Sequence, residues 1–178
     1  EYPMLSTAEL KRLPIAEKLA APDCVLFLWT TYPQYPEALE VIKAWGFTYK
    51  SIAFQWIKSY KKSGKPFFGL GRWTRGNTEP CLLATRGKPR RNAVKGEGDK
   101  APSGAAASVS QLVFWEETLI AEVGRHSAKP PEVRDRIVQL MGDIPRIELF
   151  ARDIVPGWDC MGNEVDDGAD IRAILEAL

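Results

Sequence analysis

Short apolar runs alternate with amphipathic helical segments along the chain, and this alternation constrains the fold more than any other feature. Residues 24–29 form a continuous apolar run of strand length, which is typical of a strand buried on both faces. Further strands are expected at residues 51–57, 81–85, 118–123 and 147–150, and helices at 6–13, 36–46, 130–142 and 170–178. Strands that alternate with helices predict an α/β fold with a largely parallel, doubly wound sheet.

Capping signals set the ends of these helices. Ser6 and Glu9 have the spacing of a capping box, and Pro14 stops the helix that they open. Gly46 and Gly142 stand where helices commonly end, because glycine accepts the left-handed backbone conformation of a helix C-cap.

Composition excludes several classes of protein. With 178 residues, 45% hydrophobic and 26% charged, the chain fits one globular domain, and its net charge of +1 does not by itself indicate a polyanionic partner. Three scattered cysteines and one histidine argue against a disulfide framework and against a metal site. No apolar run reaches the ~18 residues of a membrane span, so we expect no membrane contact. The sparse cysteines suit a reducing compartment, so we expect the protein in the cytoplasm of a bacterial or phage-infected cell.

Positive charge is concentrated in one part of the chain. Residues 72–100 hold eight cations and three anions, an excess of five positive charges, and residues 87–110 are expected to be a flexible basic loop rich in Gly, Ala, Ser, Lys and Arg. Such a patch suits the phosphates of a nucleic acid, although a merely solvated loop has the same composition. The candidate contacts to the nucleic-acid backbone are Arg72, Arg75, Lys88, Arg90 and Arg91.

A series of short motifs gives the chain a resemblance to a known family. In chain order they are residues 26–30 (Leu-Phe-Leu-Trp-Thr), 44–47 (Ala-Trp-Gly-Phe), 56–58 (Trp-Ile-Lys), 71–79 (Gly-Arg-Trp-Thr-Arg-Gly-Asn-Thr-Glu), 82–87 (Leu-Leu-Ala-Thr-Arg-Gly), 125–132 (Arg-His-Ser-Ala-Lys-Pro-Pro-Glu), 148–152 (Glu-Leu-Phe-Ala-Arg), 156–159 (Pro-Gly-Trp-Asp) and 162–164 (Gly-Asn-Glu). Together they resemble the adenine-N6 methyltransferases related to the catalytic subunit of the eukaryotic messenger-RNA methyltransferase, a family with DNA-modifying bacterial and phage members.

The resemblance implies a Rossmann-like fold that uses S-adenosylmethionine, with Lys129, Arg152, Asn163 and Glu164 on the cofactor side. Lys129 matches a family lysine near the carboxylate of the cofactor, and a cation there would form a charge-assisted bond. Without the resemblance, Lys129 reads as an ordinary surface lysine, and Arg152 could form a structural ion pair with Asp159.

The resemblance also implies a pocket for the target base, formed by Trp73, Asn77 and Glu79. A duplex base must leave the stack to be methylated, and a flipped base needs an aromatic face and polar groups at its edge. Two alternatives stay open, because Trp73 could belong to the core and Glu79 could pair with Arg72 or Arg75.

The signature of the family, Asp-Pro-Pro-Trp, is not present in this sequence. Its carboxylate would accept the amino hydrogens of adenine and localise the nitrogen lone pair. The resemblance places that motif upstream of Glu1, so residues 1–178 are expected to be a methyltransferase domain without its N-terminal strand and catalytic motif.

The function expected from these features is methylation of adenine N6, in DNA rather than RNA. One rival is a catalytically inactive subunit that binds RNA beside an active partner, and another is an unrelated nucleotide-binding module. The sequence leaves open whether the protein forms a homodimer or a heterodimer, and a eukaryotic source would place it in the nucleus.

The charge pattern yields a first prediction. Replacing Arg90 and Arg91 together by glutamine should weaken nucleic-acid binding and flatten its dependence on salt, because fewer phosphates are neutralised. Affinity measured over a series of salt concentrations checks this, and an unaltered salt slope would remove these arginines from the interface.

Overall fold

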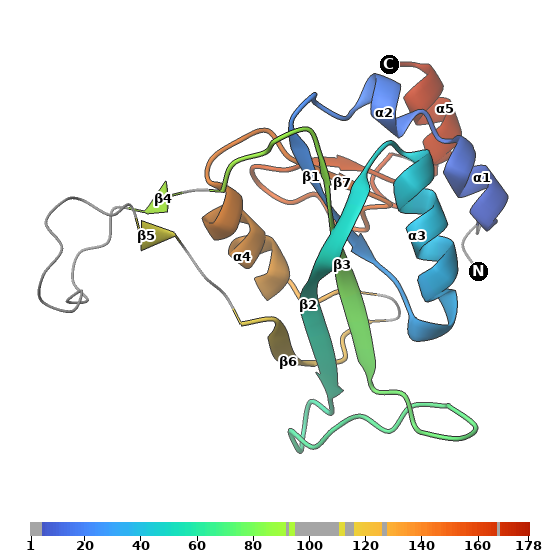
Figure 1. The fold of residues 1–178 in the computed structure, drawn as a ribbon. Coiled ribbons are helices and arrows are strands. Elements are labelled where there is room, and N and C mark those ends of the chain that lie inside the picture. The colour runs from blue at the N-terminus through green and yellow to red at the C-terminus, as the bar shows by residue number, and fades with distance from the viewer. Residues whose placement is uncertain (1–4, 92, 95–110, 113–115, 126–127, 167) are drawn as a thin grey trace, which may run out of the picture.

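The computed structural model describes residues 5–91, 93–94, 111–112, 116–125, 128–166 and 168–178 (Figure 1). The helices are α1 (Thr7–Arg12), α2 (Ile15–Lys18), the 3-10 helix η1 (Tyr32–Gln34), α3 (Tyr35–Ala44), α4 (Glu132–Met141) and α5 (Ile171–Glu176). The strands are β1 (Cys24–Trp29), β2 (Thr48–Ser59), β3 (Thr78–Arg86), β4 (Ala93–Val94), β5 (Gln111–Leu112), β6 (Thr118–Glu122), β7 (Ile147–Leu149) and β8 (Asp159–Met161).

The main sheet is mixed rather than largely parallel. Its order is β1-β3-β2-β6, in which β3 runs antiparallel to both neighbours and β2 pairs parallel with β6. A second parallel pair joins β7 to β8. The predicted α/β class is confirmed, but the expectation of a mostly parallel, doubly wound sheet is wrong. The apolar run of β3 could not reveal strand direction, because a strand buried on both faces has the same pattern in either orientation.

Helices cover both faces of the sheet. Successive side chains of a strand point to opposite faces, and β3 shows this clearly. Leu82 and Ala84 belong to a core cluster with residues of α3 and α5, whereas Cys81 belongs to a second cluster with Val133 of α4. The sheet therefore lies between α4 on one side and α1, α3 and α5 on the other (Figure 1).

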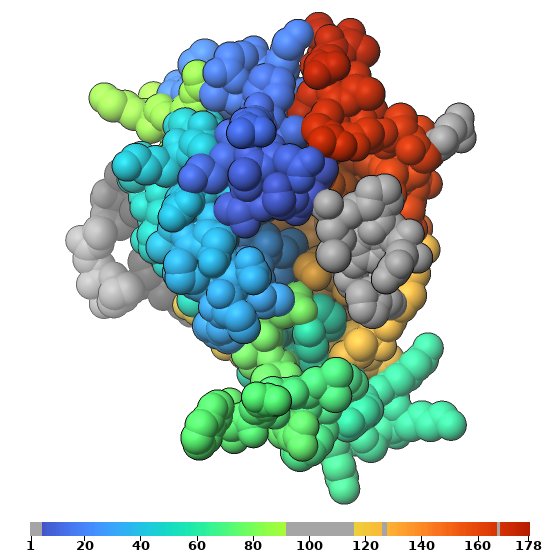
Figure 2. Space-filling view, turned by 90° about the vertical axis from the view of Figure 1, so that its right-hand side faces the viewer, coloured from blue at the N-terminus to red at the C-terminus, as the bar shows by residue number. Residues whose placement is uncertain are grey.

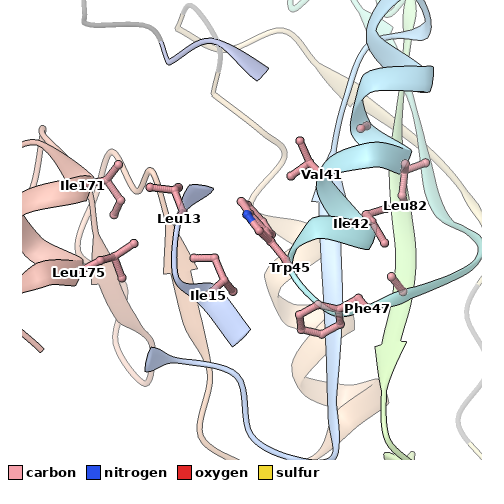
Figure 3. Packing of buried hydrophobic residues seen from close by; sticks show 11 residues of the cluster. Leu13, Ile15, Val41, Ile42, Trp45, Phe47, Leu82, Ile171 and Leu175 are labelled. Atoms are coloured by element: carbon pink, nitrogen blue, oxygen red, sulfur yellow. The ribbon is translucent and has the colours of Figure 1, made fainter. Parts of the chain in front are cut away.

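The larger cluster fixes the N-terminal and C-terminal helices to α3 (Figure 3). Trp45 is buried at its centre, and its indole Nε1 donates a 2.7 Å hydrogen bond to the carbonyl oxygen of Leu10. The capping box of Ser6 and Glu9 forms as expected, and Gly46 has a φ of 77° just after α3. These helix boundaries were therefore predictable from local chemistry.

Strand β1 lies at an edge of the main sheet, although its sequence is that of a central strand. In the part of the chain that the structure describes, β1 pairs only with β3, and all six of its residues are half-buried. A long apolar edge is unusual, because an unpaired edge is a template for further strand pairing.

Strand β8 differs from the sequence-based expectation, and part of the expected loop lies outside the described residues. Strand β8 was not predicted, because its three residues carry no recognisable period. Of the expected loop at residues 87–110, the structure describes residues 87–91 and 93–94, and the latter pair with β5. His126 lies outside the described residues. No helix in the described ranges is long and apolar enough to cross a membrane.

The two leucines Leu82 and Leu70 provide a test of this core. Leu82 is 0% exposed within the larger cluster, so Leu82→Ala should lower the free energy of unfolding by about 2–5 kcal/mol through lost burial and a cavity. Leu70 is 95% exposed, so Leu70→Ala should change it by less than about 0.5 kcal/mol. Urea unfolding measures both values, and equal losses would show that the core is assigned wrongly.

Candidate functional site

A carboxylate held between two lysines lies at the start of β3. One oxygen of Glu79, Oε1, is 2.5 Å from Nζ of Lys58, and Oε2 is 3.0 Å from Nζ of Lys129. The Glu79 side chain is only 13% exposed, so this triad is largely withdrawn from solvent. It joins one residue of the predicted base pocket directly to one predicted cofactor residue.

The sheet explains how three distant residues meet. Glu79 and Cys81 share the face of β3 that α4 covers, and Trp56 of β2 pairs in register with Glu79. Lys58 follows Trp56 by two residues and therefore lies on the same face, with its Nζ 5.0 Å from the Trp56 ring centroid. Lys129 comes from the segment just before α4.

The two lysines decide the charge of Glu79. Burial alone would raise the pKa of its carboxyl, but the hydrogen bond from Lys58 and the charge of Lys129 outweigh burial and hold the pKa below its ordinary value of 4.5. Glu79 is therefore an anion near neutral pH. The same environment raises the pKa of the buried Cys81 thiol, mainly through desolvation, so that thiol is protonated and unreactive.

A second polar cluster lies where β7 and β8 end. Arg152 pairs with Glu164, with Nε and Oε1 2.5 Å apart. The backbone of Gly162 lies close to the backbone of Ala151. A Cβ at position 162 would be 2.5 Å from the carbonyl oxygen of Ala151, so this close packing requires glycine. Phe150 is half-exposed and has a φ of 59°, a conformation that costs free energy in a residue other than glycine and often marks a functional position.

The segment between β6 and α4 connects the two clusters. Arg125 donates through Nη2 to the carbonyl oxygen of Arg152 at 3.2 Å and to Oδ2 of Asp153 at 2.5 Å. Four residues later, Lys129 reaches Glu79. One short segment after a strand thus contacts both the triad and the β7–β8 end, which is where ligands bind in open α/β sheets.

A cavity of about 280 Å³ opens beside this segment. Its lining is Lys61, Ala121, Glu122, Val123, Gly124, Pro130, Pro131 and Glu132. These residues come from the ends of β2 and β6 and from the start of α4, so the hollow lies at the carboxyl ends of the parallel strand pair. No group of three or more His, Cys, Asp or Glu side chains in the described ranges is arranged to hold a metal ion.

The structure brings together some of the predicted site residues and separates others. Lys129 meets Glu79, and Arg152 meets Glu164, with Asn163 beside it in the chain. Asn77 contributes its carbonyl oxygen to the backbone amide of Lys58 at 2.8 Å. Trp73 lies apart from these groups, since it is fully exposed in the loop between β2 and β3. A base pocket that includes Trp73 stays a prediction.

The five predicted phosphate contacts fall into two groups. Arg72 and Arg75 precede β3, whereas Lys88, Arg90 and Arg91 follow it, and the backbone amide of Lys88 donates to Oδ1 of Asp23 before β1. The nine-residue strand β3, which is about 27 Å long, lies between the two groups in the chain. The two groups therefore flank opposite ends of β3, and their contact with phosphates stays a prediction.

Two residues of the site were not singled out from the sequence. Lys58 stood within a matching motif, but only its contact with Glu79 gives it a role. Phe150 read as the last residue of an apolar strand, and only its backbone conformation distinguishes it. Alternation along β2 could have placed Lys58 on the α4 face, and Phe150 stood within the matching motif at residues 148–152, although nothing in that motif indicated its backbone conformation.

The fold and these two clusters agree with a methyltransferase family. The chain belongs to the MT-A70 family, whose family model matches residues 1–164. It is 36% identical over 167 residues to the type II methyltransferase M.MunI of Mycoplasma sp, covering 94% of this chain and 61% of that protein.

Two human relatives extend this comparison. The N(6)-adenine-specific methyltransferase METTL4 is 30% identical over 92% of this chain and 33% of its own length. The N(6)-adenosine-methyltransferase catalytic subunit METTL3 is 27% identical over 93% of this chain and 25% of its own length. The chain thus spans less than two thirds of each of these relatives.

The triad predicts a pH-dependent contribution to stability. Glu79→Gln removes the buried carboxylate that Lys58 and Lys129 both contact and should cost about 1–3 kcal/mol of unfolding free energy at pH 7. Because the folded state lowers the pKa of Glu79, its contribution is present above the ordinary pKa and is lost as pH falls through the lowered value. The difference between wild type and variant should therefore shrink at low pH.

Glu40→Gln is the matched control, because Glu40 pairs with Lys11 on the surface, where 62% of its side chain is exposed. Solvent screens such a pair, so the control should lose much less stability. Urea unfolding at pH 7 and at acid pH provides the measurement. Equal losses for the two variants would contradict a stabilising buried triad.

Proposed function

We propose that the protein containing this chain transfers a methyl group from S-adenosylmethionine to N6 of adenine in DNA. Family membership supports the class of reaction, and the names of two human relatives specify the N6 position of adenine or adenosine. The observation that carries the proposal is that Arg125 and Lys129, which come from the connection between β6 and α4, reach two different clusters. Arg125 contacts Arg152 and Asp153, and Lys129 contacts Glu79, which supports a cofactor side next to a base side.

The residues of the β7–β8 cluster and Lys129 fit S-adenosylmethionine by their chemistry. Lys129 carries an ammonium charge, and such a cation would hold the carboxylate of the cofactor through a charge-assisted bond. The Glu164 carboxylate and the Asn163 amide would bind ribose hydroxyls, and the half-exposed ring of Phe150 would pack on the adenine of the cofactor. S-adenosylmethionine supplies the methyl group.

Glu79 would act on the base. Each of its two carboxylate oxygens accepts one lysine bond, and each has a second acceptor position that an amino hydrogen of adenine could use. Lys58 and Lys129 keep the carboxylate ionised and fix its direction, which preorganises the acceptor before the base arrives.

The Asp-Pro-Pro-Trp motif expected upstream of Glu1 stays a prediction. The free edge of β1 supports it, because this apolar strand pairs on one side only within the described residues. We propose that the strand leading to the motif pairs with that edge. The preference for DNA rests on the resemblance to short bacterial and phage members and on the 36% identity to a type II methyltransferase.

Methyl transfer tests the proposal directly. The full-length protein is incubated with S-adenosylmethionine and unmethylated plasmid DNA, and the digested nucleosides are separated by mass spectrometry. We expect N6-methyldeoxyadenosine, in larger amount than N6-methyladenosine from an RNA transcript of the same sequence. Methylation of RNA alone would overturn the DNA assignment. No methylation of either would favour the inactive partner subunit.

Asn163 tests the cofactor side separately. Asn163→Ala should weaken binding of S-adenosylhomocysteine by about fivefold while the fold stays intact, since one neutral hydrogen bond contributes about 1 kcal/mol. Calorimetry on the full-length protein measures the affinity, and the exposed Gln34, replaced by alanine, is the control. An unchanged affinity of the Asn163 variant would show that the cofactor assignment is misplaced.

A further inference from the structure

The connection between β2 and β3, residues 60–77, projects beyond the body of the molecule and is here called the projecting loop (Figures 1 and 2). At its far end Leu70 is 95% exposed and Trp73 is fully exposed, and Phe68 is 64% exposed. Three large, strongly exposed apolar side chains within six residues of one loop make that loop a candidate binding surface. The proposed cofactor and base sites use none of the three.

The backbone of the projecting loop holds these side chains in a closed turn. A Cβ at Gly69 would clash with the carbonyl of Gly76, and a Cβ at Gly71 would clash with the carbonyl of Thr74. The two arms of the turn therefore lie in direct contact, which requires glycine at both positions. Leu70 and Trp73 are presented by a shaped turn rather than by an open coil.

The base of the projecting loop is anchored beside the triad. Phe67 donates its backbone amide to the carbonyl oxygen of Lys58 at 2.8 Å, and the rings of Tyr60 and Phe67 pack with centroids 5.1 Å apart. The loop ends at Asn77, whose carbonyl oxygen accepts the backbone amide of Lys58. Its two ends thus meet at the residue that fixes Glu79.

Charge identifies the partner. Residues 60–77 contain five cations, Lys61, Lys62, Lys65, Arg72 and Arg75, and no Asp or Glu, although the whole chain has a net charge of only +1. All five cations are exposed, and Arg75 lies over the Phe68 ring at 5.0 Å. An apolar tip surrounded by cations is complementary to stacked bases between phosphates.

We propose that Leu70 and Trp73 insert into the base stack of duplex DNA as a wedge while the cations of the projecting loop bind the flanking phosphates. The inference rests on the proposed function, because a methylated base must first leave the stack. The wedge would occupy or widen the gap next to the adenine that the Glu79 triad receives. Trp73 would thus act on the neighbouring base pairs rather than on the target base.

Unwinding of a closed-circular plasmid tests the wedge without knowledge of the target sequence. A topoisomerase relaxes the plasmid in the presence of the full-length protein, and the change in linking number after protein removal reports insertion between base pairs. Wild type should change the linking number. The double variant Leu70→Ala, Trp73→Ala should leave it at the protein-free value and bind the plasmid about tenfold more weakly.

Two control variants separate insertion from binding. Leu178→Ala removes an exposed apolar side chain from the opposite part of the chain and should behave as wild type. The double variant Lys61→Gln, Lys62→Gln should reduce the slope of log affinity against log salt by the amount expected for about two phosphate contacts. It should still unwind the plasmid at saturating protein.

Three results would overturn the proposal. The first is an unchanged linking number with wild type, and the second is equal unwinding by wild type and the Leu70, Trp73 double variant. The third is a double variant that loses only self-association in sedimentation, which would make the tip a protein interface. The methyl-transfer assay distinguishes these failures from failure of the proposed function, since N6-methyldeoxyadenosine would still form.

Discussion

The ion-paired carboxylate of Glu79 is the interaction on which the rest of the site depends. Removing a carboxylate from water is costly, and this one is mostly buried, so it stays ionised only because Lys58 and Lys129 both contact it. Those lysines come from β2 and from the segment before α4. The triad therefore connects the central strands of the sheet to the helix that covers one of its faces. It lies at the end of the sheet where ligands bind in α/β proteins.

Around that carboxylate the fold separates three tasks. The end of the β7–β8 pair, with Phe150 and Gly162, offers an aromatic ring and a close backbone approach suited to a nucleoside. The triad holds an ionised carboxylate, which is the acceptor that we propose for the base. The projecting loop offers an apolar tip and positive charge. Arg125 contacts the β7–β8 end, and Lys58 of the triad anchors the projecting loop. The sites that we propose for the cofactor and for the nucleic acid therefore adjoin one end of the sheet.

Membership of the MT-A70 family and the geometry of the chain support each other, but they differ in what they explain. The family relation accounts for the order of the motifs. The geometry shows why Trp73 and Glu79, six residues apart in one motif, have different surroundings: one is fully exposed at a turn, and the other is held by two lysines. A motif therefore does not guarantee a shared pocket.

Sequence by itself determined the local elements and the class of fold. The Ser6 capping box, the cap at Gly46 and the strand at residues 24–29 depend on neighbours in the chain and formed as expected, although that strand lies half-buried at an edge of the sheet. Tertiary structure decided the antiparallel direction of β3, the separation of the basic residues to its two ends and the pairing of Lys129 with Glu79. These features depend on contacts between segments far apart in the sequence, and a hydrophobic pattern encodes burial but neither strand direction nor partner.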